Sequence, residues 1–301
     1  MTKTTYEEIL KALVEEDERF MVLTAENRAA IRNLPNQIGN RFIDTGIMEQ
    51  TLVGICAGLA LRGRIPVAHA LATFLTLRAF EFVRTDVGIS CLPVKLVGGV
   101  PGFLSEANGP THQAIEDVSI MRGIPPMNVF CPADEEDMLI GLRTILEHPE
   151  PFYIRYNNVK PVCQHNHTFE CGKAEIFSEG KDVTLIVYGF LFGEAFKAKE
   201  LLEQKGVSVG LINLRTVKPI DEAAILNAVN NSRWIVTIED HFLVGGLYTI
   251  LAEILLRHKQ TANVLPFALN NKWFKPALLN DVLEHEGFTA QQMADSILEK
   301  I

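Results

Sequence analysis

One acidic residue, Glu49, begins a stretch of the chain that is otherwise built from apolar and small residues. The helical pattern over residues 48–62 would place Glu49 in the first turn of a helix, where the helix dipole favours a carboxylate. From this residue alone, a charge that only stabilises the helix end and a charge that serves a binding site both remain open.

Three basic side chains stand where they could meet a ligand. His112 lies in a loop at 109–113 that begins with glycine and proline, so a core role does not easily explain it, although a role in ordering the loop remains open. Arg155 ends a predicted strand, and parallel sheets bind ligands at the carboxyl ends of their strands. Arginine forks suit phosphates, so Arg155 and Arg78 are candidates for an anionic substrate end. A structural ion pair remains the alternative for Arg78.

A further set of possible ligands is formed by two cysteines and two histidines: Cys163, His165, His167 and Cys171. All four can bind zinc, but their spacing is not that of a standard finger, so we predict no metal site in this chain. The five cysteines are an odd number scattered in apolar segments. That usage is typical of a reducing cytoplasm and not of a disulfide framework.

Short apolar runs alternate with helical patterns along the chain, which is typical of α/β domains with parallel sheets. The strand-like runs are 20–25, 65–70, 94–97, 128–131, 151–156, 183–188, 207–214, 234–238 and 264–268. The main helical patterns are 5–16, 48–62, 74–83 and 134–147, with others beginning at Asp221, Leu247 and Thr289. Between 157 and 181 the pattern weakens. We therefore predict two α/β domains, 1–160 and 182–301, joined by a linker at 161–181.

Some helix ends can be predicted from single residues. Asp44 or Thr45 could cap the helix that carries Glu49, and Gly63 could close it. Asp134 could cap a later helix, with Asp137 completing an imperfect capping box.

The overall charge and hydropathy exclude several kinds of partner. The formal net charge is −9 over 301 residues, and no dense basic cluster occurs, which argues against nucleic acid. No run reaches the roughly 18 apolar residues of a membrane span, and the N-terminus lacks the apolar core of a signal peptide. We therefore expect a cytoplasmic protein with no membrane partner.

Motifs in consecutive order along the chain resemble the transketolase family. RFIDTGIMEQ at 41–50 resembles the family's F-D-x-G-I-x-E-Q/H before a helix of small residues. GPTHQ at 109–113, with Glu116 and Asp117, matches G-P-T-H-Q-x-x-E-D. Shorter matches are GRIPV at 63–67, ATFLTLRAF at 72–80, CPAD at 131–134, YIR at 153–155, LRTVKPID at 214–221 and EDHFLVGG at 239–246. Together they span almost the whole chain.

The resemblance implies a thiamine-diphosphate-binding domain of the pyrimidine type at 1–160 and a transketolase C-terminal-type domain, used for assembly, at 182–301. No G-D-G motif for the diphosphate and its metal occurs. The implied protein is thus one subunit of a split-gene transketolase. Its role would lie in carbohydrate metabolism, for example in the pentose phosphate reactions. Its partner would be the N-terminal, diphosphate-binding subunit, which would hold most of the Mg²⁺ (or Ca²⁺) contacts, and a heterotetramer is expected. The implied reaction moves a two-carbon ketol unit from a ketose, or its phosphate, to an aldose, or its phosphate.

The resemblance also implies roles for single residues. Glu49 would hydrogen-bond the aminopyrimidine ring of thiamine diphosphate and activate the cofactor. Phe74 would stack on that ring, with a core phenylalanine as the alternative, and Leu77 and Phe80 would line its pocket. His112 would contact the sugar.

The substrate side departs from the family pattern. Arg78, Asn108 and Arg155 are the remaining substrate-binding candidates beside His112, but Asn108 stands where an aspartate is typical. A histidine expected about a dozen positions before His112 is replaced by GVP at 99–101. A modified sugar or a non-phosphate anion is therefore as open as a sugar phosphate.

Three alternatives remain. The β subunit of a 2-oxoacid dehydrogenase has the same domain plan and a glutamate in the same place, although GPTHQ favours transketolase. Deoxyxylulose-phosphate synthase shares T-H-Q but is usually one long chain. A non-catalytic assembly subunit would tolerate the loss of Glu49, yet Glu49, Phe74 and His112 are all present.

Overall fold

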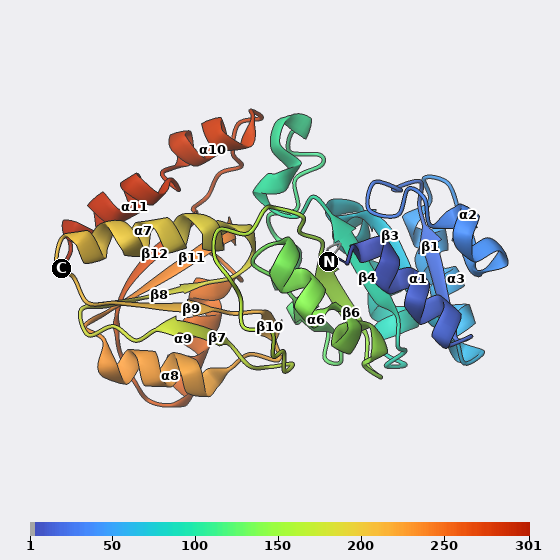
Figure 1. Ribbon diagram of the computed structural model, residues 1–301, viewed down its shortest axis with the longest axis horizontal. Coiled ribbons are helices and arrows are strands. Elements are labelled where there is room, and N and C mark those ends of the chain that lie inside the picture. Colours follow the sequence, from blue (N-terminus) through green and yellow to red (C-terminus); the bar gives the residue numbers. More distant parts are fainter. Residues whose placement is uncertain (1–3) are drawn as a thin grey trace.

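The computed structural model describes residues 4–301 as two α/β domains that lie side by side (Figure 1). Residues 1–3 belong to the N-terminal segment predicted to lack a signal peptide, and they lie outside the described residues. Each domain is centred on one sheet, as the alternation of strand and helix patterns predicts.

The first sheet has seven strands in the order β10-β5-β6-β4-β3-β1-β2. Its strands are β1 (Phe20–Thr24), β2 (Phe42–Asp44), β3 (Ile65–Leu71), β4 (Lys95–Gly99), β5 (Asn128–Phe130), β6 (Phe152–Arg155) and β10 (Thr216–Lys218). Neighbouring strands are parallel except β10, which comes from the second half of the chain and pairs antiparallel with β5. The carboxyl ends of the parallel strands therefore meet at one edge, where such sheets bind ligands.

Helices cover both faces of this sheet. The helices α1 (Tyr6–Glu16) and α6 (Glu135–Glu147) pack on one face, and α3 (Glu49–Leu61) packs on the other. Because side chains alternate along a strand, Val22 faces the α1 and α6 side whereas Leu23 faces α3. The shorter helices are α2 (Pro35–Ile38), η1 (Gly39–Arg41), η4 (Phe103–Asn108) and α5 (Asp117–Arg122).

The segment predicted as one helix over 74–83 is helical but irregular. It consists of η2 (Phe74–Arg78), α4 (Phe80–Phe82) and η3 (Val83–Gly88), and η2 and η3 are π-helical. In the first of these turns the amide of Ala79 donates to the carbonyl of Phe74, five residues earlier, at 3.0 Å. Such widened turns are rare and are frequent at functional sites.

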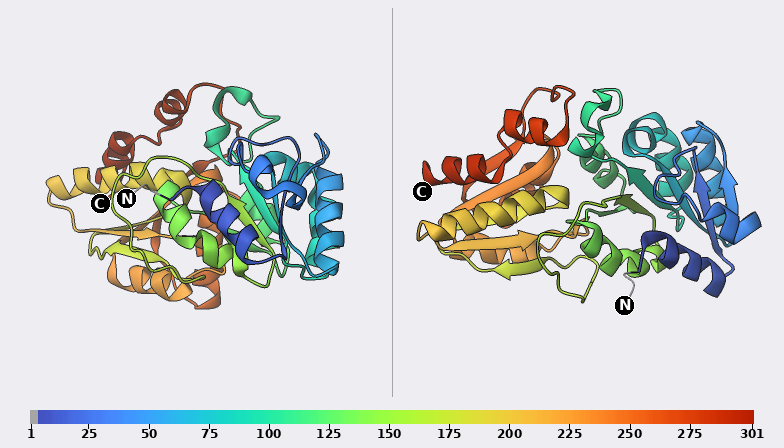
Figure 2. Two further views of the ribbon diagram at one scale, coloured as in Figure 1. Left: turned by 45° about the vertical axis from the view of Figure 1, so that its right-hand side comes forward. Right: turned by 45° about the horizontal axis from the view of Figure 1, so that its top comes forward.

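The second sheet has five strands in the order β12-β11-β8-β9-β7. The strands are β7 (Glu175–Ser178), β8 (Val183–Val187), β9 (Val209–Asn213), β11 (Trp234–Phe242) and β12 (Asn263–Leu269). Its helices are η5 (Gly189–Leu191), α7 (Phe192–Gln204), α8 (Glu222–Asn231), α9 (Leu247–Arg257), α10 (Leu279–Glu286) and α11 (Ala290–Leu298). Figures 1 and 2 show α7, α10 and α11 on one side of this sheet and α8 on the other.

Three details differ from the sequence predictions. The strand β7 lies inside the segment predicted as a linker and pairs with β9, and the short strands β2 and β10 were not expected. Neither Asp44 nor Thr45 caps α3, because the helix begins only at Glu49. The Asp44 carboxylate instead accepts from the amides of Gly46 and Glu26 at 3.0 and 3.1 Å.

Two other predicted helix ends are confirmed. Gly63 has φ +80 and its amide donates to the carbonyl of Ala60 at 2.9 Å, which closes α3. The side chain of Asp134 accepts from the amide of Asp137 and so caps α6. Asp137 does not complete a capping box, since its carboxylate accepts from the amide of Ala133.

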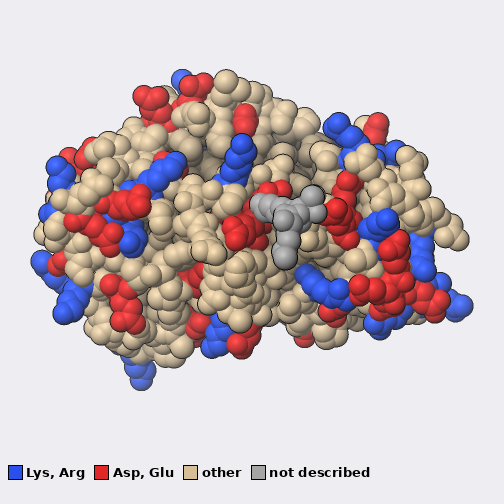
Figure 3. All heavy atoms as spheres, viewed as in Figure 1, with Lys and Arg blue, Asp and Glu red and all other residues tan. Residues whose placement is uncertain are grey.

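Charged side chains of both signs occur on the surface. On the face drawn in Figure 3, lysine and arginine side chains are interspersed with acidic ones. Within residues 4–301, every helix is too short or too polar to cross a membrane.

Candidate functional site

Glu49 is the first residue of α3 and is only 2% exposed. The helix begins without a side-chain cap, so this carboxylate lies against the positive end of the helix dipole. The loop before it is anchored by Asp44, which also accepts from the Arg28 guanidinium at 2.9 Å. The short loop between β2 and α3 thus holds the buried carboxylate of Glu49 at the edge of the first sheet.

The Arg78 guanidinium contacts both Glu49 and Phe74. Its Nη1 donates to Oε2 of Glu49 at 2.9 Å, and its central carbon lies 4.0 Å from the centre of the Phe74 ring. Both Phe74 and Arg78 belong to the π-helical turn η2, four residues apart, a spacing at which helical side chains are neighbours. This one turn therefore supplies both the aromatic ring and the cation that lies over it.

His112 reaches the same place from a third segment. Its ring centre lies 5.2 Å from that of Phe74, with an angle of 66° between the planes. Its Nδ1 is 2.9 Å from the hydroxyl of Thr111, and its amide donates to the carbonyl of Gly109. Three predicted site residues are thus linked: Arg78 connects Glu49 with Phe74, and His112 contacts Phe74 directly.

The other predicted site residues are next to this group along the chain. Leu77 is exposed and Phe80 is half-buried on the same helical segment as Phe74. Asn108 is the last residue of η4 and is exposed, directly before the loop of His112.

Arg155 lies in different surroundings. Its Nε donates to Asp117 at 2.9 Å and its Nη1 donates to Asp240 at 2.6 Å. The hydroxyl of Tyr153 also donates to Asp117, at 2.7 Å. Burial raises the pKa of Asp240 to about 6, although Arg155 opposes this shift. The predicted substrate arginine is therefore a buried link between the two domains, with its guanidinium committed to protein carboxylates.

A second buried cluster surrounds His165. Its Nδ1 lies 2.8 Å from Glu175 and its Nε2 lies 2.8 Å from Asp134. Arg215 joins the cluster through Asp137, with 2.6 Å between Nε and Oδ1. Burial alone would lower the pKa of His165, but the hydrogen bonds to the two carboxylates outweigh it and raise the pKa to about 10. The ring is therefore a doubly protonated cation.

This protonation state bears on metal binding. A metal needs a free nitrogen lone pair, and here both ring nitrogens of His165 donate hydrogen bonds. Within residues 4–301, the one cluster of histidine, cysteine and acidic side chains with metal-like spacing is Asp137, His165 and Glu175. Of the four zinc candidates in the sequence, His165 alone belongs to it.

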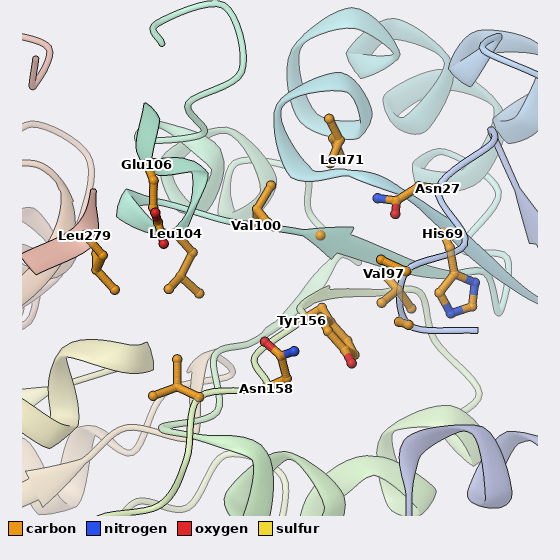
Figure 4. Close-up of a pocket in the computed structure, with 14 residues that line it drawn as sticks. Asn27, His69, Leu71, Val97, Val100, Leu104, Glu106, Tyr156, Asn158 and Leu279 are labelled. Carbon is orange, nitrogen blue, oxygen red and sulfur yellow. The ribbon is translucent and has the colours of Figure 1, made fainter. Parts of the chain in front are cut away.

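A cavity of about 440 Å³, which sequence reasoning did not anticipate, lies at the carboxyl ends of β1, β3, β4 and β6 (Figure 4). Polar groups that line it are Asn27, His69, Glu106, Tyr156 and Asn158. Burial lowers the pKa of His69 to about 4. The lining residues in the described part of the chain include no lysine or arginine.

His69 is held in one orientation at the wall of this cavity. Its Nδ1 lies 3.1 Å from the carbonyl of Leu23, to which it donates, and its Nε2 lies 2.8 Å from the hydroxyl of Tyr6. A second notable wall residue is Val100, which lies in the segment 99–101, where the family resemblance leads one to expect a histidine.

Comparison with known proteins adds to this geometry. Residues 1–160 match the transketolase pyrimidine-binding domain, and residues 172–293 match the transketolase C-terminal domain. The chain is 37% identical over 257 residues to the 6-deoxy-6-sulfo-D-fructose transketolase subunit SqwH of Clostridium sp. (strain MSTE9), covering 84% of this chain and 80% of that protein.

Two further similarities extend over nearly the whole chain. The 1-deoxy-D-xylulose-5-phosphate synthase of Dictyoglomus thermophilum is 33% identical over 310 residues, which are 99% of this chain but 50% of the synthase. A solved structure of a split-gene transketolase, an inactive β4 tetramer, superimposes with a TM-score of 0.88 at 31% identity. That match covers 98% of this chain and 96% of the other.

Proposed function

The chain belongs to the transketolase family, and we propose that it is one subunit of a split thiamine-diphosphate enzyme that transfers a two-carbon ketol unit from a ketose to an aldose. The observation that carries this proposal is the buried carboxylate of Glu49 at the start of α3, which shares the guanidinium of Arg78 with the ring of Phe74. A buried acceptor next to a flat aromatic face suits a planar heterocycle with ring N–H groups.

The residues present fit the aminopyrimidine half of the cofactor. Glu49 would accept a hydrogen bond from a ring nitrogen, and Phe74 would stack on the ring face, with Leu77 and Phe80 beside it. Thiamine diphosphate, when bound, supplies the electron sink that lets a carbon–carbon bond next to a carbonyl break and form. His112 would orient the substrate by a hydrogen bond to a hydroxyl or carbonyl oxygen, since Thr111 already meets its other nitrogen.

A partner subunit would supply the rest of the site. No G-D-G motif occurs in this chain, so we propose that the diphosphate and Mg²⁺ (or Ca²⁺) are held mainly by an N-terminal-type subunit. Exposed apolar side chains flank Glu49 and Arg78, as expected of a surface that a partner covers: Ile47, Met48, Leu77, Phe82 and Ile89. A heterotetramer is the assembly that we propose, located in the cytoplasm, where five unpaired cysteines remain reduced.

The cavity at the strand ends supports a proposal about the substrate. We assign it to the end of the sugar that is remote from the reacting carbon. Glu106 is its one charged lining residue in the described part of the chain, because burial keeps His69 neutral. A wall with one acidic side chain and no cation favours hydroxyl groups over a phosphate dianion. Nothing on such a wall would offset the free-energy cost of removing water from the dianion. An uncharged sugar end should therefore bind better in this part of the site.

A second activity has its own support. The synthase of Dictyoglomus thermophilum matches 99% of this chain, so a related transfer to an aldose phosphate remains a candidate. Purified chain and its partner would be supplied with a ketose donor or with pyruvate. An aldose phosphate would be present as acceptor in both assays, and transfer from pyruvate with release of CO2, but not from the ketose, would favour the synthase-like reaction.

Reconstitution tests the main proposal. The full chain would be combined with a diphosphate-binding subunit, thiamine diphosphate and Mg²⁺, and ketol transfer would be followed. We expect Glu49→Gln to lower the rate on the order of 10²-fold while the fold is retained, since loss of acid–base help costs about that much. Glu81→Gln, a change at an exposed glutamate of the same region, serves as the control. A Glu49→Gln rate within about threefold of wild type would overturn the proposed role.

A further inference from the structure

The Arg78 guanidinium makes the two contacts that the proposed site offers to a cofactor ring. It is planar, it lies 4.0 Å over the ring of Phe74, and it donates to Oε2 of Glu49 at 2.9 Å. A bound aminopyrimidine would be planar too, would stack on Phe74 and would donate to Glu49. The guanidinium and the heterocycle thus satisfy the same aromatic face and the same carboxylate.

We propose that Arg78 is a built-in occupant of the cofactor pocket, which the aminopyrimidine ring must displace in order to bind. This proposal rests on the proposed function, because that function assigns Glu49 and Phe74 to the cofactor. It assigns to Arg78 a role in which the side chain competes with the cofactor and does not bind the substrate.

The geometry allows such an exchange. The Glu49 side chain is 2% exposed, so its carboxylate needs a hydrogen-bond donor whenever the chain is folded. The Arg78 side chain is 41% exposed, so its guanidinium can turn into solvent once another donor takes its place at Glu49. The described contacts of its guanidinium are with Glu49 and Phe74. One donor can therefore replace the other at the same carboxylate.

The spacing of Phe74 and Arg78 along the chain explains how the arginine reaches this place. Both residues belong to the turn η2, and side chains four residues apart are neighbours on one face of a helix. The turn is π-helical, because it is closed by the bond from Ala79 to Phe74, five residues apart. The segment that carries the stacking residue therefore also carries the cation that contacts it.

The first test is the affinity of the assembled complex for its cofactor. Full-length chain with its diphosphate-binding partner would be titrated with thiamine diphosphate at fixed Mg²⁺ by calorimetry, for wild type, Arg78→Met and Arg84→Met. Arg84 is an exposed arginine of the same helical segment and provides the matched control. We expect Arg78→Met to lower the dissociation constant by roughly three- to tenfold, since the ring no longer displaces a charge-assisted bond. Arg84→Met should leave it unchanged.

Either an unchanged or a raised dissociation constant for Arg78→Met would overturn the displacement proposal. If the wild-type complex does not bind thiamine diphosphate at all, the proposed function fails instead, and the two failures are thereby distinguished.

A second measurement follows the Arg78 guanidinium of the wild-type chain directly. Guanidinium NMR signals of ¹⁵N-arginine-labelled wild-type chain would be recorded, with the Arg78 signal assigned by its loss in Arg78→Met. We expect Glu49→Gln to move that signal, and thiamine diphosphate added to the complex to move it in the same direction. A signal that responds to Glu49→Gln but not to a cofactor that binds would contradict displacement.

Discussion

Two arginines that the sequence makes comparable candidates for an anionic substrate, Arg78 and Arg155, lie in opposite surroundings. The Arg78 side chain is 41% exposed and bonds one carboxylate from an irregular helical turn. The Arg155 side chain is 3% exposed and bonds two carboxylates, one from each domain. The comparison teaches that the number and burial of an arginine's partners decide whether it can exchange them. Arg78 can exchange its partner, whereas Arg155 is a fixed part of the domain interface.

Replacement of Arg155 should have the largest effect on stability. Arg155→Met leaves Asp117 and Asp240 buried without their cation, so we expect the free energy of unfolding to fall by about 3–5 kcal/mol. Urea denaturation followed by circular dichroism at neutral pH would measure this change, with Arg84→Met as the surface control. A loss below about 1 kcal/mol, the range of surface pairs, would mean that the link is not structural.

The His165 cluster is also a buried set of a cation and carboxylates, but its contribution to stability depends on pH. Its pKa is raised from 6.5 to about 10 in the folded chain, so the folded state holds this proton more tightly than the unfolded state. The stability from this histidine is fully present below pH 6.5 and is lost as the pH rises through about 10.

Comparison with a variant isolates this contribution from other titrating groups. The difference in urea midpoint between wild type and His165→Gln should be largest at pH 6 and should shrink toward pH 10. A difference that stays constant over this range would show that the histidine does not carry a proton in the cluster.

The smallest effect on stability is expected for Arg78. Its pair with Glu49 is open to solvent on the arginine side, so Arg78→Met should lower the free energy of unfolding by about 1 kcal/mol or less. The same urea experiment serves for both arginines. A loss as large as that of Arg155→Met would remove the contrast between the two sites and would make Arg78 a structural residue.

Much of the fold follows from local sequence. The strands over 20–24, 65–71 and 183–187 appear close to their predicted positions because short apolar runs between helical patterns suit buried parallel strands. Gly63 and Asp134 end and begin their helices as predicted, since caps depend on contacts within one turn. The placement of Glu49 in the first turn of its helix was predictable for the same reason.

The sequence by itself thus determined the two α/β domains, the helix that presents Glu49 and the transketolase family. Only the tertiary structure decided which charges meet, because the partners of Arg155 stand 38 and 85 residues away along the chain. The π-helical form of the turn that carries Phe74 and Arg78 and the strand β10 that joins the first sheet likewise left no local signal. Helix periodicity and capping act within a few residues, whereas ion pairing and burial depend on distant segments that only folding brings together.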